Sequence, residues 1–187
     1  MDKSGERATA ERIQRLEDPD NYRYLSGEEL RTFLDPGPEW RIADLGSGTG
    51  FYTREIAPAV GTVYAVDINP EMHRYYRRNG MASNVVTLTA DVARLPFGSD
   101  ELDGAVSTRT CHHGLDEVLP EVARTLRPGG PLVIVDWSAT GANERETSRD
   151  EEYFDIATTQ SLLLDAGFRI RSAEERRETF IVTATAR

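Results

Sequence analysis

A glycine-rich segment follows a short apolar run and has the composition of a ligand-binding loop. Residues 44–51 read Asp-Leu-Gly-Ser-Gly-Thr-Gly-Phe, with glycines at Gly46, Gly48 and Gly50. Glycine lets the backbone turn tightly and lets a ligand approach without interference from a Cβ atom. The helix expected after this loop offers unpaired N–H groups to an electronegative atom. The segment therefore predicts a backbone cradle for a polar part of a small molecule.

Two acidic residues further along the chain could recognise other parts of the same ligand. Asp67 ends the second apolar run, where a carboxylate can accept hydrogen bonds from both hydroxyls of a ribose. Asp91 and Val92 follow the third run, where a side-chain acceptor and a backbone N–H could read an adenine edge. The C-terminal ends of neighbouring parallel strands meet at one edge of a sheet. The three loops thus predict a single nucleoside site.

The elements that must position these loops alternate between strand-like and helical patterns. Such alternation with short links predicts an α/β fold, doubly wound, with a mostly parallel seven-stranded sheet and helices on both faces. The last two strands, 168–172 and 179–185, have no helix between them and should form an antiparallel pair. The other expected strands are 40–45, 62–66, 85–88, 102–107 and 132–137, and the expected helices are 26–34, 51–59, 69–80, 117–126 and 153–166.

The N-terminal part is expected to differ from this core. Residues 1–20 are polar and charged with weak helical spacing, so we expect them to be frayed or to lie on the surface. Ser26 followed by two glutamates reads as a helix start. We therefore divide the chain into an N-terminal helical segment or lid, residues 1–35, and a ligand-binding domain, residues 36–187.

The ordered combination of these motifs resembles the class I S-adenosylmethionine-dependent methyltransferases. It is most similar to the small-molecule group related to the quinone-biosynthesis enzymes. The resemblance covers about residues 40–185 and implies the Rossmann-like fold expected above. It rests on the glycine motif 44–51, Asp67, Asp91 with Val92, the Leu-Pro-Phe segment 95–97, the Arg-Pro-Gly-Gly turn 127–130 and the final antiparallel pair.

The resemblance implies S-adenosylmethionine as cofactor and S-adenosylhomocysteine as product. It implies that the loop backbone cradles the methionine part and that Asp44 holds its ammonium. Asp67 would take the ribose, and Ile68 would pack on one face of the adenine. The floor near the sulfonium would come from Ser107 or Thr108. The implied cofactor-binding residues are Asp44, Gly46, Ser47, Gly48, Gly50, Asp67, Ile68, Asp91, Val92, Ser107 and Thr108.

Other side chains are weaker candidates. His112 and His113 follow the fourth strand and could act as a base, but a packing role is the stronger interpretation. Together with His73 they lack metal-ligand spacing, so no metal site is expected. Tyr22 and Tyr24 could close the site as part of a lid, or could anchor the N-terminal segment to the sheet.

Composition limits the remaining function classes. The net charge of −10 argues against nucleic-acid partners, and no apolar run approaches the roughly 20 residues of a spanning helix, so no membrane insertion is expected. No signal peptide is readable, and a cytoplasmic location is the default expectation. Lys3 is the only lysine among 22 basic residues. This favours a halophilic source, although a GC-rich genome has the same effect.

The sequence favours a methyltransferase with a small-molecule acceptor. Two alternatives stay open. One is a non-catalytic S-adenosylmethionine-binding module, suggested by the short segment 138–152 after the fifth strand. The other is a nicotinamide-dependent oxidoreductase, which shares the glycine-plus-acid arrangement but has different glycine spacing. Neither the acceptor nor the oligomeric state is indicated.

Overall fold

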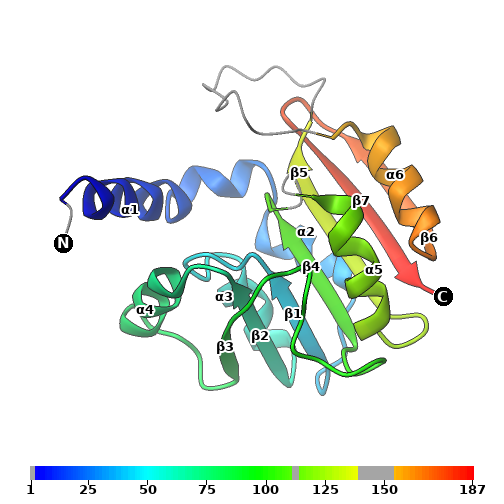
Figure 1. Ribbon diagram of the computed structural model, residues 1–187, viewed down its shortest axis with the longest axis horizontal. Coiled ribbons are helices and arrows are strands. Elements are labelled where there is room, and N and C mark those ends of the chain that lie inside the picture. The colour runs from blue at the N-terminus through cyan, green and yellow to red at the C-terminus, as the bar shows by residue number, and fades with distance from the viewer. Residues whose placement is uncertain (1–2, 111–113, 139–153) are drawn as a thin grey trace.

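A computed structural model describes residues 3–110, 114–138 and 154–187, with side chains from residue 9 onward. The described strands form one seven-stranded sheet in the order β3-β2-β1-β4-β5-β7-β6 (Figure 1). β1 to β5 run parallel, whereas β7 pairs antiparallel with both β5 and β6. The predicted fold class is confirmed. The strands are β1 Arg41–Leu45, β2 Thr62–Asp67, β3 Val85–Thr89, β4 Gly104–Thr108, β5 Pro131–Trp137, β6 Phe168–Glu175 and β7 Thr179–Ala186.

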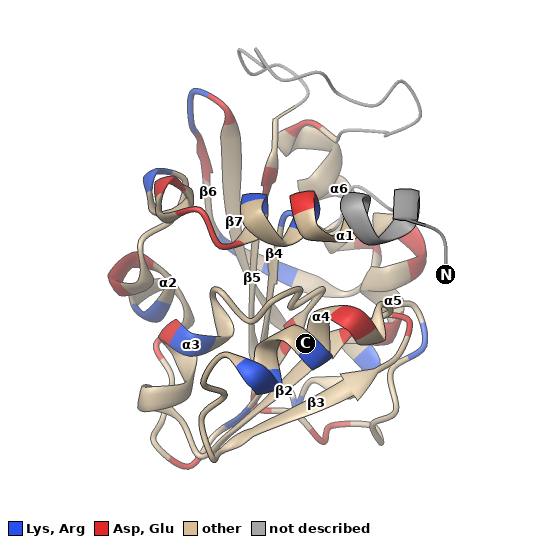
Figure 2. Ribbon diagram, turned by 90° about the vertical axis from the view of Figure 1, so that its left-hand side faces the viewer, with Lys and Arg blue, Asp and Glu red and all other residues tan. Residues whose placement is uncertain are grey.

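Helices cover both faces of the sheet, and each face has its own apolar core. One core joins the sheet to α2, α3 and α4, and the other joins it to α5 and α6 (Figure 2). β5 shows the alternation: Leu132 and Ile134 face α5, whereas Val133 and Val135 face α2. The helices are α1 Lys3–Leu16, η1 Pro19–Arg23, α2 Gly27–Leu34, α3 Thr53–Ile56, η2 Ala57–Ala59, α4 Pro70–Arg78, α5 Leu115–Thr125 and α6 Ile156–Asp165.

Local sequence explains where several of these helices begin. Ser26 forms a complete capping box with Glu29 at the start of α2. Asn69 accepts a hydrogen bond from the Glu71 N–H, and Pro70 occupies the first position of α4. The expected helix 51–59 is split into α3 and η2 because Pro58 has no N–H to continue the α-helical ladder.

The N-terminal segment is helical and lies on the surface, which are two of the expectations, but within the described residues it is not frayed. Residues 3–16 form the continuous helix α1, which lies above the strand ends and α4 in Figure 1. It is tied down at its C-terminal end, since Glu17 forms an ion pair with Arg54 of α3 at 2.7 Å. Tertiary contacts that the local spacing does not encode therefore order this segment.

The strand order reverses between the neighbouring strands β1 and β4. The loops after these strands therefore diverge to opposite faces and leave a crevice at the C-terminal edge, which is where ligands bind in open α/β sheets. None of the helices within the described ranges has an apolar stretch long enough to cross a membrane.

Candidate functional site

A cavity of about 640 Å³ lies at this edge of the sheet. Its volume is within the range of pockets that enclose small molecules and cofactors. The lining comes from the loops after β1, β2, β3, β4 and β5, and from one face of α1. The lining residues are Arg12, Arg15, Leu16, Gly46, Gly48, Asp67, Ile68, Ala90, Asp91, Val92, Thr108, Arg109, Thr110 and Trp137.

The glycine loop needs glycine for two separate reasons. Gly46, Gly48 and Gly50 all have positive φ, at 70°, 53° and 81°, where other residues are strained. A Cβ atom on Gly46 would also collide with the side chain of Thr110, and one on Gly50 would collide with the ring of Tyr76. The loop is therefore tightly packed at Gly46 and Gly50, and Gly46 and Gly48 line the cavity.

Asp67 is buried and held by the glycine loop. Its Oδ2 accepts a hydrogen bond from the Gly48 N–H, and its Oδ1 accepts one from the Asn69 N–H, both at 2.8 Å. A carboxylate has about four acceptor positions, so both oxygens retain a lone pair for a ligand. The side chain thus couples the β1 and β2 loops and presents a fixed acceptor to the cavity.

Asp44 lies behind the loop and is outside the cavity lining. Its Oδ2 accepts a hydrogen bond from the hydroxyl of Thr53, while its Oδ1 has no partner among the described residues. Burial raises the pKa of Asp44 to about 6, and the nearby Asp67 charge adds to the rise. Ser47 Oγ and Thr49 Oγ1 also lack partners within the described part of the chain. Buried polar atoms without partners are uncommon in folded proteins.

An apolar edge completes this part of the cavity. Ile68 leaves 69% of its surface exposed although it is a large apolar residue, and it lines the cavity beside Val92. Asp91 is also in the lining, and its Oδ1 accepts a hydrogen bond from the Ala93 N–H at 2.9 Å. An exposed isoleucine beside a carboxylate offers a surface for a flat ring with polar edges.

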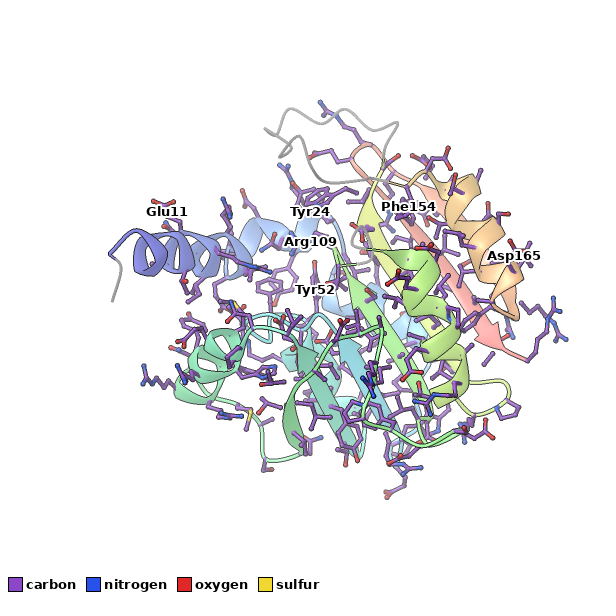
Figure 3. All side chains as sticks on the ribbon, in the orientation of Figure 1. Glu11, Tyr24, Tyr52, Arg109, Phe154 and Asp165 are labelled. Atoms are coloured by element: carbon purple, nitrogen blue, oxygen red, sulfur yellow. The ribbon has the colours of Figure 1, made fainter. Side chains whose placement is uncertain are left out.

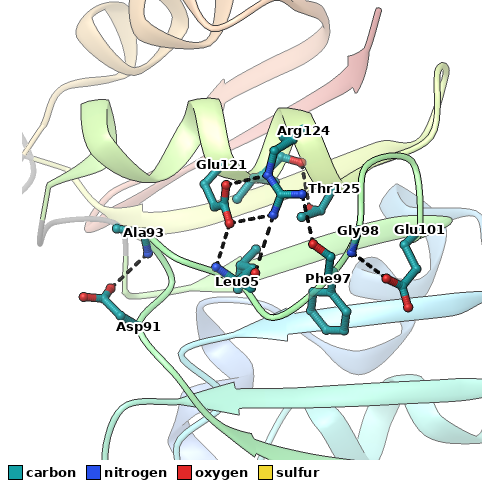
Figure 4. Close-up of polar contacts among 10 residues, drawn as sticks. Asp91, Ala93, Leu95, Phe97, Gly98, Glu101, Glu121, Arg124 and Thr125 are labelled. Carbon is teal, nitrogen blue, oxygen red and sulfur yellow. Dashed lines mark hydrogen bonds and ion pairs between the residues drawn. The ribbon is translucent and has the colours of Figure 1, made fainter.

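A charged pair fixes the loop that carries Asp91. Glu121 of α5 accepts a hydrogen bond from the Leu95 N–H at 2.8 Å and pairs with Arg124 at 2.7 Å (Figure 4). Arg124 in turn donates to the carbonyl of Phe97 at 2.9 Å. The pair lowers the pKa of Glu121, so this carboxylate stays ionised and keeps its hold on the loop.

The sequence predicted a lid from segment 1–35 but did not indicate which residues of α1 line the cavity. Arg12, Arg15 and Leu16 line the cavity, and Leu16 lies directly against Gly48. Helical spacing through Ile13 and Leu16 was the available signal, but it did not show which part of the chain α1 would contact. Arg109 and Thr110, which come directly after β4, also line the cavity but were not among the predicted site residues.

Asn21 connects α1 to the rest of the site. Its Nδ2 donates to the carbonyls of Arg15 and Leu16 at 2.9 and 3.1 Å. These two carbonyls lie in the last turn of α1, where the helix itself offers no N–H partner. Its Oδ1 accepts a hydrogen bond from Arg109 at 2.7 Å, and its carbonyl accepts one from the Tyr52 hydroxyl at 3.0 Å. This buried side chain therefore sets the position of α1 relative to β4.

Arg109 lies at the centre of an aromatic cluster. Its φ of 57° is unusual for a residue other than glycine. Its guanidinium lies 5.8 Å from the ring centroid of Tyr24 and 5.6 Å from that of Trp137. Figure 3 shows Tyr24, Arg109 and Tyr52 grouped between α1 and the ends of the strands. The cluster fixes a cation at the cavity wall.

Tyr22 and Tyr24, for which the sequence left a lid role and an anchoring role open, lie outside the cavity lining. Tyr24 is buried edge-on against Trp137, with ring centroids 4.9 Å apart. Tyr22 donates a hydrogen bond to Glu55 at 2.6 Å and packs on Phe51. These contacts are those of anchoring residues.

The remaining predicted site residues fall into two groups. Ser47, Gly50 and Ser107 are buried and are not among the lining residues, whereas Thr108 is in the lining. His112 and His113 lie outside the described residues. His73 is buried on α4 with its Nδ1 3.2 Å from the hydroxyl of Thr89, away from the cavity. The described residues contain no group of three acidic, histidine or cysteine side chains placed to bind a metal ion.

Comparison with known proteins shows similarity to methyltransferases. Residues 43–134 match a family described as a methyltransferase domain. The chain superimposes on a SAM-dependent methyltransferase from Aquifex aeolicus with a TM-score of 0.81 and 26% identity, covering 95% of this chain and 98% of that one.

Two curated relatives match at the sequence level. The ubiquinone/menaquinone biosynthesis C-methyltransferase UbiE of Pseudomonas aeruginosa is 31% identical over 62% of this chain and 49% of its own length. O-methyltransferase cnsE of Penicillium expansum is 30% identical over 80% of this chain and 59% of its own. The chain thus spans about half the length of the curated relatives it matches.

Proposed function

We infer that this chain, which carries a class I methyltransferase domain similar to that of UbiE, transfers a methyl group from S-adenosylmethionine to a small-molecule acceptor. The observation that carries this proposal is the hydrogen bond from the Gly48 N–H to Asp67. It unites the glycine loop and the acid after β2 in one cavity, as a nucleoside-containing cofactor requires.

The residues present fit such a cofactor. Asp67 would accept hydrogen bonds from the ribose, and Ile68 and Val92 would contact the adenine, with Asp91 at its edge. Asp44 Oδ1, buried and unpartnered among the described residues, would attract the ammonium, directly or through water. The cofactor supplies a methyl group that is already activated by its sulfonium charge.

The protein's own contribution to the transfer is alignment and exclusion of water. α1 lies over the glycine loop through Leu16, so it shields that part of the cavity from solvent. Thr108 and Thr110 line the cavity after β4 and would position the acceptor beside the cofactor. The segment 1–35 as a lid over the domain 36–187 is part of this proposal.

The acceptor is proposed to be a small molecule, and not a nucleic acid. The relatives' names describe transfer to carbon in one case and to oxygen in another, so the atom methylated in this protein stays open. The net charge of −10 opposes binding of a polyanion. A cytoplasmic location stays a prediction, and fractionation of the source cells would check it.

Titration calorimetry with S-adenosylhomocysteine tests the cofactor assignment directly. We expect saturable binding and a rise in melting temperature, because a ligand that binds only the folded state stabilises it. NADH serves as the comparison ligand and should give neither. If the folded protein binds NADH but does not bind S-adenosylhomocysteine, the result would support the alternative of a nicotinamide-dependent oxidoreductase. Transfer of labelled methyl to any acceptor would exclude a non-catalytic binding module.

A further inference from the structure

Asn21 connects separate elements of the site, although it is not one of the described residues that line the cavity. Its Nδ2 donates to the carbonyls of Arg15 and Leu16 in the last turn of α1, and its Oδ1 accepts a hydrogen bond from Arg109 directly after β4. Only 3% of its surface is exposed. Buried polar groups that lose their partners are costly, so these hydrogen bonds favour one arrangement of α1 relative to β4.

The backbone of Asn21 is anchored independently of its side chain. Its carbonyl accepts a hydrogen bond from the Tyr52 hydroxyl at 3.0 Å, and its N–H donates to the Asp18 carbonyl at 3.0 Å. Tyr52 is buried in the apolar core that also contains residues of α2 and α3. Burial raises the pKa of Tyr52 to about 12, so its hydroxyl keeps its proton and remains a donor. The Asn21 side chain therefore extends from a fixed point of the core.

The hydrogen bonds of Asn21 reach two parts of the cavity wall. On one side they hold the Leu16 backbone, and the Leu16 side chain lies against Gly48, where an added Cβ atom would be 3.2 Å from the Leu16 Cδ1. On the other side they reach Arg109, which lines the cavity after β4. Asn21 thus ties the residue that covers the glycine loop to the loop after β4.

We propose that Asn21 is a positioning residue for the cofactor, because it fixes the last turn of α1 relative to β4 and so keeps Leu16 against the glycine loop. The inference rests on the proposed function and adds a residue that acts through its neighbours. Glu17 also ties α1 down, through its ion pair with Arg54 of α3. A helix held by one element can pivot, whereas attachments to both α3 and β4 define its direction. A cover fixed in advance loses less entropy when the ligand binds.

Asn21→Asp separates the two sets of hydrogen bonds. An aspartate has nearly the same size and keeps the acceptor for Arg109, but it cannot donate to the carbonyls of Arg15 and Leu16. We expect S-adenosylhomocysteine affinity, measured by calorimetry on the full chain, to fall about tenfold, because α1 no longer holds its place over the glycine loop. Trypsin should also cleave faster after Arg15, since the end of α1 is released.

Asn84→Asp is the matched control, because Asn84 makes the same kind of contact elsewhere. Its Nδ2 donates to the carbonyls of Ala57 and Val60 at 2.8 and 3.0 Å, and these three described residues are not in the cavity lining. The variant loses the same donors, so its melting temperature should fall as in Asn21→Asp. Its S-adenosylhomocysteine affinity should change by less than about twofold. If the aspartate variants do not fold, Asn21→Ala and Asn84→Ala replace them.

A double-mutant cycle with Leu16→Ala shows whether Asn21 acts through α1. Leu16→Ala shortens the side chain that lies against Gly48 and should weaken S-adenosylhomocysteine binding by itself. If Asn21 acts by placing Leu16, the double variant should bind no more than about twofold more weakly than the weaker single variant. A purely structural role of Asn21 predicts additive losses, because the two changes would then act independently.

Three results would overturn the inference. Asn21→Asp could bind S-adenosylhomocysteine as tightly as the unaltered protein, Asn84→Asp could weaken binding equally, or the losses in the cycle could be additive. The second result would mean that binding follows overall stability and not the position of α1. Each of these results is observed with an unaltered protein that binds S-adenosylhomocysteine. An unaltered protein that does not bind it contradicts the proposed function, and this inference with it.

Discussion

Asp67 is the residue on which the cofactor assignment depends most. Replacing it with alanine removes two acceptors for the ribose, each worth about 1.5–3 kcal/mol before water compensates. S-adenosylhomocysteine affinity should therefore fall at least about tenfold. The melting temperature should fall as well, because the Gly48 and Asn69 N–H groups lose their acceptor. Calorimetry and a thermal melt measure the two effects.

Two further variants separate binding from folding at this position. Asp67→Asn keeps the size of the side chain and one acceptor oxygen, so its fold should be less affected than its binding. Asp165→Ala removes an exposed acid at the end of α6 and should alter neither. If Asp67→Ala bound S-adenosylhomocysteine as well as the unaltered protein does, Asp67 would only hold the glycine loop.

Asp44 should make cofactor binding depend on pH. Burial raises its pKa from 3.8 to about 6, so between these values the folded state holds more protons than the unfolded state. The free energy of unfolding therefore decreases as pH rises through this window. Above it Asp44 is ionised and attracts the ammonium, so S-adenosylhomocysteine affinity should rise between about pH 5 and pH 7.

Asp44→Asn supplies the control. It should bind S-adenosylhomocysteine weakly, with little change across the same pH range, and should not lose stability through this titration. Calorimetry at several pH values measures the first effect and chemical denaturation the second. The same pH profile in both proteins would show that another group titrates.

At the scale of the elements, α1 is the part whose removal is most informative. Tyr24 and Leu25 are buried, so a deletion that extended to residue 25 would remove core packing. Deletion of residues 1–17 takes away α1 and leaves these residues in place. We expect the remaining chain to fold and to bind S-adenosylhomocysteine more weakly, because Leu16 no longer covers Gly48.

Deletion of residues 1–8 is the matched control, since it retains Arg12, Arg15 and Leu16. Trypsin provides an independent measurement on the full chain. Cleavage after Arg12 or Arg15 should slow when S-adenosylhomocysteine is added, if α1 is a lid that closes on the cofactor. The lid proposal is contradicted if both truncated chains bind S-adenosylhomocysteine with equal affinity and if the ligand does not change the rate of cleavage. Another part of the chain would then have to shield the cofactor.

At the scale of the whole molecule, the acid excess should make stability depend on salt. Figure 2 shows acidic residues distributed over many elements and not gathered at one site. With a net charge of −10, self-repulsion destabilises the folded state at low ionic strength. Screening lengths fall from about 10 Å at 0.1 M to about 3 Å at 1 M salt. The melting temperature should therefore rise from dilute buffer into molar potassium chloride.

A second salt serves as the control for this prediction. Potassium chloride and sodium chloride should act alike, since screening depends on ionic strength. Surface ion pairs such as Arg23 with Glu178 weaken in salt, but each contributes little. A melting temperature that does not change with salt would favour a GC-rich genome over a halophilic source. It would leave the cofactor prediction unaffected.

The sequence by itself determined the sheet, its helices and the loops that carry Gly46, Asp67 and Asp91. These features depend on local patterns: apolar runs of strand length, glycines where φ is positive, and caps such as Ser26 and Asn69. A residue at the end of a parallel strand lies at the carboxyl end of the sheet, where ligands bind. The positions of Asp67 and Asp91 in the cavity therefore followed from the pattern.

Only the tertiary structure decided how α1 and Arg109 enter the site. α1 has weak amphipathic spacing, and its position depends on Asn21 and on the ion pair between Glu17 and Arg54, which join segments far apart in the chain. No local pattern records which carbonyls a buried asparagine will reach. For Tyr24 the sequence left a lid role and an anchoring role open, and in the structure its ring is buried edge-on against Trp137. Long-range side-chain contacts, and not local propensity, therefore position α1 and Arg109 at the cavity.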